Sequence, residues 1–192
     1  MEGMSIFWHP FFIKNQEFYN FNTMKNLLVF FSVLCLFSFI ESEGVVFKSA
    51  DSKTKITADD QWTAAGNMKG VEIYISRTNT VTGIPTIIVV SKDENLLEDV
   101  QLGTYSAGKL FLQTAVLKTT PSFSGEKVID GKTFKYYEYE YDNKDLIKMK
   151  TLVYHTLVGR TGYQMTVTSE EEGFNLNKPL YNQIANSLII TE

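Results

Sequence analysis

Hydrophobic and polar residues alternate along several segments of the chain, as they do in strands with one solvated face. Residues 71–76 alternate strictly, whereas residues 86–90 are continuously apolar and predict a strand covered on both faces. Asp130-Gly131 predicts a tight hairpin, because a type I′ turn needs positive φ at both central residues. Further strands are expected at 45–47, 55–58, 115–120, 127–129, 133–141, 147–158 and 163–168.

Two segments show helical spacing of their apolar residues. Residues 94–112 predict a helix with an apolar stripe on one side, and two glycines within it allow a break. Residues 177–188 predict a second helix that docks on the sheet. The stripe of the first helix comprises Leu97, Val100, Thr104, Ala107 and Phe111, and that of the second Leu180, Ile184 and Leu188. This order of elements predicts an α+β fold, with a mostly antiparallel sheet covered by helices in an α/β/α sandwich.

The N-terminal region has a composition of its own. Residues 1–44 hold 11 of the 26 aromatic residues but only six of the 40 charged ones. Residues 27–40 form an uncharged apolar run with Lys25 before it and a polar exit after it, which is the layout of a secretory signal. The run is shorter than the roughly 20 residues of a membrane span. We therefore expect cleavage at Gly44/Val45 or after Ser42, with an uncleaved anchor as the alternative.

The chain is accordingly divided into three parts. Residues 1–23 fit neither a signal nor a domain and are interpreted as a mis-assigned start or an extension, the true start being Met24. Residues 24–44 are the signal peptide or anchor, and residues 45–192 form a single domain. The expected location is secreted, periplasmic or in the cell envelope, with membrane attachment only if the N-terminal segment stays uncleaved.

Composition excludes several classes of function. The net charge of −4 provides no basic surface for nucleic acid. Beyond residue 44 the sequence contains no Cys and one His, His155, which rules out Cys–His catalysis and a His/Cys zinc site. His155 lies among alternating apolar residues and is interpreted as a core histidine. No catalytic residue, metal or organic cofactor is expected.

Tyrosines cluster on the strands of the second half. Tyr137, Tyr139 and Tyr141 share one face, and Tyr154 joins them if the hairpin pairs about Asn143-Lys144. Such a face either packs beneath a helix or presents an aromatic platform to a ligand or partner. These four tyrosines are the candidate binding residues.

Carboxylates alternate with the same tyrosines. Glu138, Glu140 and Asp142 project from the opposite face of that strand and its exit. This pattern is typical of a hydrated sheet face, and it also meets one requirement of acid–base catalysis or hard-cation binding.

Four segments of the sequence carry a family resemblance: Asp59-Asp60-Gln61-Trp62, Ile129-Asp130-Gly131-Lys132, residues 162–168, and Phe174 with residues 181–187. Together they resemble the PsbP-like superfamily, which includes the photosystem II extrinsic protein, a nuclear Ran-GTPase release factor and bacterial DcrB-like domains. The resemblance spans nearly all of residues 45–192 and implies the fold described above for an exported or accessory protein without catalysis. The family's usual Pro-x-Gly-Trp is replaced here by Asp59-Asp60-Gln61-Trp62, and no Ran- or manganese-binding motif is present.

The predicted function is an exported, non-enzymatic binding module for a protein partner or a small amphipathic ligand. Two alternatives remain open. One is a weak hydrolase that uses the carboxylate row with Lys148 or Lys150, and the other is an intracellular chaperone for partner helices.

Overall fold

The computed structural model describes residues 44–65, 70–79 and 82–191. Residues Glu43–Glu192 form one compact unit, and all its core residues lie between Ile56 and Ile190. A chain that begins at Glu43 therefore contains every core residue of the described part of the protein. The interpretations of residues 1–23 and of the signal peptide concern residues outside the described ones.

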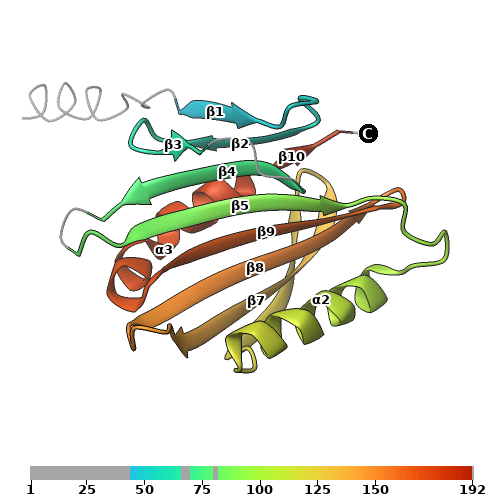
Figure 1. The fold of residues 1–192 in the computed structure, drawn as a ribbon. Coiled ribbons are helices and arrows are strands. Elements are labelled where there is room, and N and C mark those ends of the chain that lie inside the picture. Colours follow the sequence, from blue (N-terminus) through green and yellow to red (C-terminus); the bar gives the residue numbers. More distant parts are fainter. Residues whose placement is uncertain (1–43, 66–69, 80–81, 192) are drawn as a thin grey trace, which may run out of the picture. The chain divides into compact units, whose positions relative to one another are not determined.

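Two antiparallel sheets make up the strand content (Figure 1). The larger has the order β3-β4-β5-β9-β8-β7-β6, and the smaller has the order β1-β2-β10. The strands are β1 (Val45–Lys48), β2 (Thr54–Ala58), β3 (Thr63–Ala64), β4 (Val71–Thr78), β5 (Pro85–Asp93), β6 (Phe123–Ile129), β7 (Lys132–Asp142), β8 (Lys148–Val158), β9 (Thr161–Glu170) and β10 (Ile189–Ile190). The helices are α2 (Leu102–Leu117) and α3 (Glu171–Asn186).

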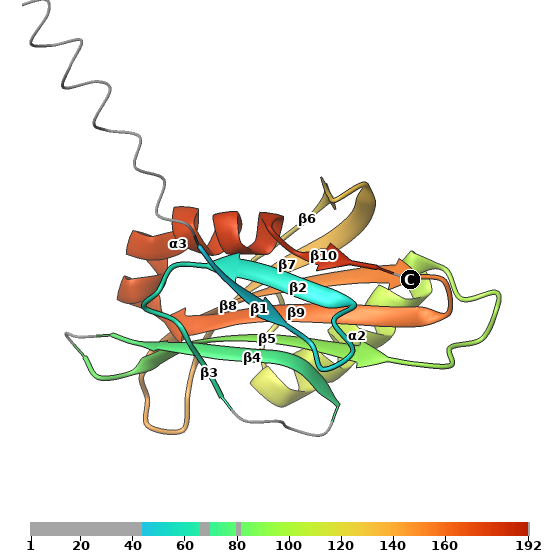
Figure 2. The same ribbon diagram turned by 90° about the horizontal axis from the view of Figure 1, so that it is seen from above.

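The two helices cover opposite faces of the larger sheet. On β8, Tyr154 faces α3, where its hydroxyl donates to Asn182 Oδ1 at 3.2 Å. The next residue, His155, faces α2, where Nδ1 lies 2.8 Å from Ser106 Oγ. Because neighbouring residues of a strand point to opposite faces, the sheet separates the helices. The predicted α/β/α layering is confirmed, with β1, β2 and β10 added beside α3 (Figure 2).

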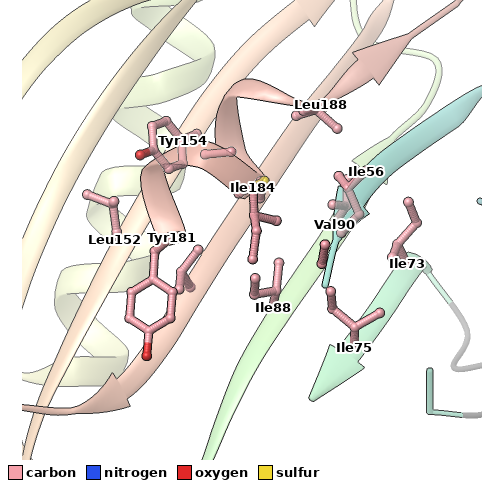
Figure 3. Packing of buried hydrophobic residues seen from close by; sticks show 14 of the residues in the cluster. Ile56, Ile73, Ile75, Ile88, Val90, Leu152, Tyr154, Tyr181, Ile184 and Leu188 are labelled. Carbon is pink, nitrogen blue, oxygen red and sulfur yellow. The ribbon is translucent and has the colours of Figure 1, made fainter. Parts of the chain in front are cut away.

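The hydrophobic core lies between the larger sheet, α3 and β2 (Figure 3). Several strands contribute alternate residues to it, such as Ile73 and Ile75 from β4 and Ile88 and Val90 from β5. Ile184 from α3 closes the layer. Trp62, Phe174 and Tyr181 pack at one end, with the Trp62 and Tyr181 rings edge to face at 6.5 Å.

Helix α2 differs from its prediction at both ends. It begins at Leu102 and not at residue 94, because residues 95–100 form turns, with Asn95 at φ 60° and Leu96 N–H donating to Arg160 O. It then continues through Gly103 and through residues expected in a strand at 115–120, ending at Leu117. Of the described residues, no helix is both long and apolar enough to span a membrane.

Helix α3 also starts earlier than predicted. It begins at Glu171 and not at residue 177, so Glu171 and Glu172 form its first turn. Acidic side chains are favourable there because the helix dipole is positive at its N-terminus. The hairpin at Asp130-Gly131 is confirmed, with φ of 48° and 72° at its two central residues.

The β7–β8 connection has a different register from the one expected. Its loop spans residues 143–147, which places Asp142 opposite Lys148 and Tyr154 opposite Tyr136. Pairing about Asn143-Lys144 would instead put Tyr154 opposite an odd-numbered residue of β7. The longer loop therefore moves Tyr154 to the face opposite Tyr137, and the expectation of one shared face is wrong for Tyr154.

Candidate ligand-binding groove

A groove of about 500 Å³ runs between α3 and the strands β6, β7 and β8. Strand alternation builds it, because Tyr136 and Glu138 on β7 face the same side as Leu152 and Tyr154 on β8. Its lining comprises Ser122, Phe123, Lys127, Tyr136, Glu138, Glu140, Leu152, Tyr154, Lys178 and Asn182.

Three aromatic rings form a ladder along the groove. The ring centroids of Phe123 and Tyr136 are 5.7 Å apart, and those of Tyr136 and Tyr154 are 5.9 Å apart. Gly125 lies opposite Tyr136, and a Cβ at Gly125 would come within 2.8 Å of the Tyr136 ring. Glycine is therefore required here for the ring to lie flat over β6. The ladder provides an apolar surface suited to an acyl chain or an aromatic ring.

A lysine stands at one end of the ladder. Lys127 Nζ lies 4.7 Å from the Tyr154 ring centroid and donates to Asn186 Oδ1 at 2.9 Å. Burial lowers the pKa of Lys127. Within the described part of the chain, no carboxylate lies within 4 Å of this ammonium group. The groove thus combines an aromatic surface with a cation that has no anionic partner.

The predicted carboxylate row is only partly brought together. Glu138 is 8% exposed and pairs with Lys178 at 2.6 Å, while Glu140 pairs with Lys150 at 2.8 Å. Asp142 is exposed at the end of β7 and is not part of the groove lining. Two of the three carboxylates are therefore ion-paired rather than simply hydrated. Across residues 44–65, 70–79 and 82–191, no three His, Cys, Asp or Glu side chains gather to hold a metal.

The other predicted tyrosines lie on the opposite face of the sheet. Tyr139 is 1% exposed, and the Tyr137 hydroxyl lies 3.0 Å from Ser106 Oγ of α2. Tyr141 is partly buried, with its hydroxyl 3.4 Å from Thr151 Oγ1. Tyr137 and Tyr139 pack against the α2 side and do not present an open platform. Of the four candidate tyrosines, only Tyr154 lines the groove.

His155 is a buried core residue, as the sequence predicted. It is 1% exposed, and Ser106, its partner in α2, is fully buried. Burial, together with the charge of Lys109, lowers the pKa of His155 to about 4. The imidazole is therefore neutral at pH 7, and a substrate cannot reach the Ser106 hydroxyl beside it.

A second hollow, of about 600 Å³, lies where β4 and β5 meet the start of α3. Its polar groups bond to one another: Thr86 Oγ1 lies 2.9 Å from Ser169 Oγ and 3.1 Å from the Tyr181 hydroxyl. Asn79 donates to Glu170 Oε1 at 2.5 Å. Several polar groups of the second hollow are therefore paired with one another.

Sequence reasoning did not identify Phe123, Lys127 or Lys178. Phe123 and Lys127 face the groove because they occupy alternate positions of β6, a strand expected only at residues 127–129. The sequence does place Phe123, Gly125 and Lys127 at every second position, as expected for one face of a strand. The signal is weak because the glycine in the middle has no side chain.

No protein-family model matches the sequence, and no curated protein matches it significantly. Solved structures do match. Cyanobacterial PsbP (CyanoP) from Synechocystis sp. PCC 6803 is similar over 78% of this chain and 93% of its own, with 12% identity and a TM-score of 0.55. The two structures therefore superpose over most of both chains. The chain has the PsbP-like fold.

Two further structures share the PsbP-like fold. LpqN, described as involved in cell envelope biogenesis of Mycobacterium tuberculosis, matches over 80% of this chain and 88% of its own, with 14% identity and a TM-score of 0.54. A protein from Bacteroides thetaiotaomicron VPI-5482 matches over 78% of this chain with 10% identity and a TM-score of 0.56. This chain covers 49% of that protein's length. The expected PsbP-like resemblance is confirmed at the level of the fold.

Proposed function

We propose that this chain is an exported, non-enzymatic binding module of PsbP-like fold, whose groove takes a small amphipathic ligand with an acidic head group. The observation that carries the proposal is the ladder of Phe123, Tyr136 and Tyr154 ending at Lys127, a partly buried cation without a carboxylate partner among the described residues. An acyl chain or aromatic ring packs on the ladder. The acidic group of the ligand then accepts a hydrogen bond from Lys127, which is a charge-assisted interaction.

The size of the groove suits such a ligand. A volume of about 500 Å³ is within the range of roughly 300–1,000 Å³ for small-molecule sites, which are mostly apolar with a few placed polar groups. A hydrolase is less well supported, because Glu138 and Glu140 are held in ion pairs and the Ser106 hydroxyl is buried. A location in the cell envelope or outside the cell is supported by the signal-like segment before residue 45.

Titration with sodium decanoate below its micellar concentration, followed by calorimetry, tests the groove. Lys127→Gln is expected to weaken binding at least tenfold, since a hydrogen bond to a charged group contributes about 1.5–3 kcal/mol. Phe123→Ala is also expected to weaken binding. This variant should keep the native fold, because the Phe123 side chain is 54% exposed.

Lys148→Gln is the matched control, because it removes an exposed lysine that is not part of the groove lining. Equal affinities for decanoate and decanol, or an equal loss in Lys148→Gln, would contradict the proposal. Mass spectrometry of the protein from its own source tests export separately. A mature N-terminus near Val45 is expected, and one at Met1 or Met24 would contradict cleavage.

A further inference from the structure

Helix α2 turns its polar side toward the sheet and its apolar side outward. The sheet-facing side carries most of the helix's polar groups, among them Tyr105, Ser106 and Lys109, which bond to Asp93, His155 and Tyr137. The outer side carries no charge, and one hydroxyl is its only polar side-chain group. Its eight exposed residues, called here the α2 outer face, are Gly103, Thr104, Ala107, Gly108, Phe111, Leu112, Ala115 and Val116.

Large side chains on the α2 outer face are unusually open. Phe111 is 73% exposed, Leu112 59% and Val116 76%. A surface helix of a soluble domain normally turns such residues toward the core. The part of the predicted stripe that contains Ala107 and Phe111 faces outward. A contiguous apolar strip of this kind marks an interaction surface.

The two glycines of the α2 outer face, Gly103 and Gly108, have open space beside them. A Cβ added at Gly103 or Gly108 would meet nothing within 4 Å, and neither residue has a positive φ. The fold of one copy therefore does not require glycine at either place, although glycine is a poorer helix former than alanine. Small residues on a helix surface let a second helix approach closely.

The small and large residues are segregated along the helix. Gly103, Ala107 and Gly108 occupy its N-terminal half, and the three large side chains occupy its C-terminal half. An antiparallel pairing of two copies about a point between Lys109 and Leu110 brings each large residue opposite a small one. The resulting pairs are Phe111 with Gly108, Leu112 with Ala107, Ala115 with Thr104, and Val116 with Gly103.

We propose that the α2 outer face is a homodimer interface, in which α2 packs antiparallel against α2 of a second copy about a two-fold axis. The self-complementary order of small and large residues favours a second copy over an unrelated partner, because a two-fold interface uses the same surface on both subunits. This inference is independent of the proposed function, since the groove lies on the opposite face of the sheet.

The available area sets the strength of the dimer. A 16-residue helix is about 24 Å long and 10–12 Å wide, and interdigitated side chains along it bury on the order of 500 Å² per copy. The total of about 1,000 Å² is at the lower limit for a specific interface. The dimer is therefore weak and reversible, with a dissociation constant in the micromolar range, which sedimentation experiments can follow.

Sedimentation equilibrium of the chain beginning at Glu43 is the test. A concentration-dependent monomer–dimer equilibrium is expected, and Leu112→Lys should raise its dissociation constant at least tenfold without changing the circular dichroism spectrum. Leu176→Lys is the matched control, because Leu176 is 75% exposed on α3 and lies outside the α2 outer face. A monomer at all concentrations up to 1 mM, or an equal effect of Leu176→Lys, would overturn the proposal.

Two further variants test the register. Ala107→Glu introduced together with Leu112→Lys should restore dimerisation, because the pairing places residue 107 opposite residue 112 of the other copy. Gly108→Ala should raise the thermal stability of the monomer and yet weaken the dimer at least tenfold. The new methyl group would occupy the space that the Phe111 ring of the second copy fills in the dimer. Absence of rescue by the double variant would overturn the register. A monomer that co-sediments with phosphatidylglycerol vesicles through Phe111 and Leu112 would identify a lipid surface in place of the second copy.

Discussion

The Ser106 hydroxyl and Nδ1 of His155, 2.8 Å apart, form a buried polar link between α2 and the sheet. Both residues are at most 1% exposed, and the same hydroxyl lies 3.0 Å from the Tyr137 hydroxyl. Burial, together with the charge of Lys109, lowers the pKa of His155 to about 4, so the imidazole in this link is neutral at pH 7. Acid is therefore expected to weaken the attachment of α2.

The first prediction concerns stability between pH 7.5 and pH 5. The folded-state pKa of His155, about 4, lies below its usual value of 6.5, so the unfolded chain binds more protons in this window. The free energy of unfolding should fall by about 2 kcal/mol on going to pH 5, because each unit of pKa difference corresponds to about 1.4 kcal/mol. Urea unfolding at the two pH values measures the change.

The chain beginning at Glu43 suits this experiment, since His155 is then its only histidine. His155→Gln should remove the pH-dependent step while lowering stability at pH 7.5. An imidazole signal that titrates near pH 6.5 in nuclear magnetic resonance would contradict the prediction directly.

A second prediction concerns Gly162, which lies directly beneath the ring of Tyr105. A Cβ at Gly162 would come within 2.3–2.8 Å of three atoms of that ring. Gly162→Ala should therefore lower the free energy of unfolding by about 1–3 kcal/mol, as overpacking does in well-packed sites. In a Tyr105→Ala background the same substitution should cost less than about 0.5 kcal/mol, because the ring is gone and the two effects are coupled. Equal costs in both backgrounds would show that the ring is not the cause.

The ion pair between Glu138 and Lys178 leads to a third prediction. The Glu138 carboxylate is buried, whereas Lys178 is partly exposed, and the two side chains lie 2.6 Å apart. Lys178→Met leaves the carboxylate without its partner and should cost about 1–2 kcal/mol of stability. Adding Glu138→Gln should recover part of that loss, since no buried charge remains. Thermal unfolding of the two variants measures this, and a greater loss in the double variant would count against the ion pair.

Much of the sheet was predictable because its signals are local. The Asp130-Gly131 hairpin needs only two residues with positive φ, and the alternation in Val71–Thr78 and in Thr161–Glu170 is visible without any partner strand. The face on which Tyr154 lies was not predictable in this way. It depends on the length of the β7–β8 loop, and a change of register by an odd number of residues reverses the face.

Helix α2 shows a different limit of sequence reasoning. Its apolar residues do have helical spacing, but Tyr105, Ser106 and Lys109 face the sheet because His155, Tyr137 and Asp93 offer them partners. Polar groups that bond to one another across an interface can be buried at little cost. The apolar pattern alone therefore indicated the helix but not which of its sides is covered. The groove was missed because β6 was expected only at residues 127–129, which left Phe123 outside the predicted strand.

A fourth prediction follows from the loop that sets the β7–β8 register. Asn143 Oδ1 accepts hydrogen bonds from the backbone N–H groups of Asp145 and Ile147, each at 2.9 Å. Asn143→Ala removes both bonds and should lower the free energy of unfolding by about 1–2 kcal/mol, whereas Asn143→Asp keeps an acceptor oxygen for both N–H groups and should cost less. Hydrogen exchange of the Ile147 amide should accelerate in Asn143→Ala alone. If Asn143→Asp destabilises as much as Asn143→Ala, the side-chain acceptor does not hold the loop, and the face on which Tyr154 lies is fixed by strand packing instead.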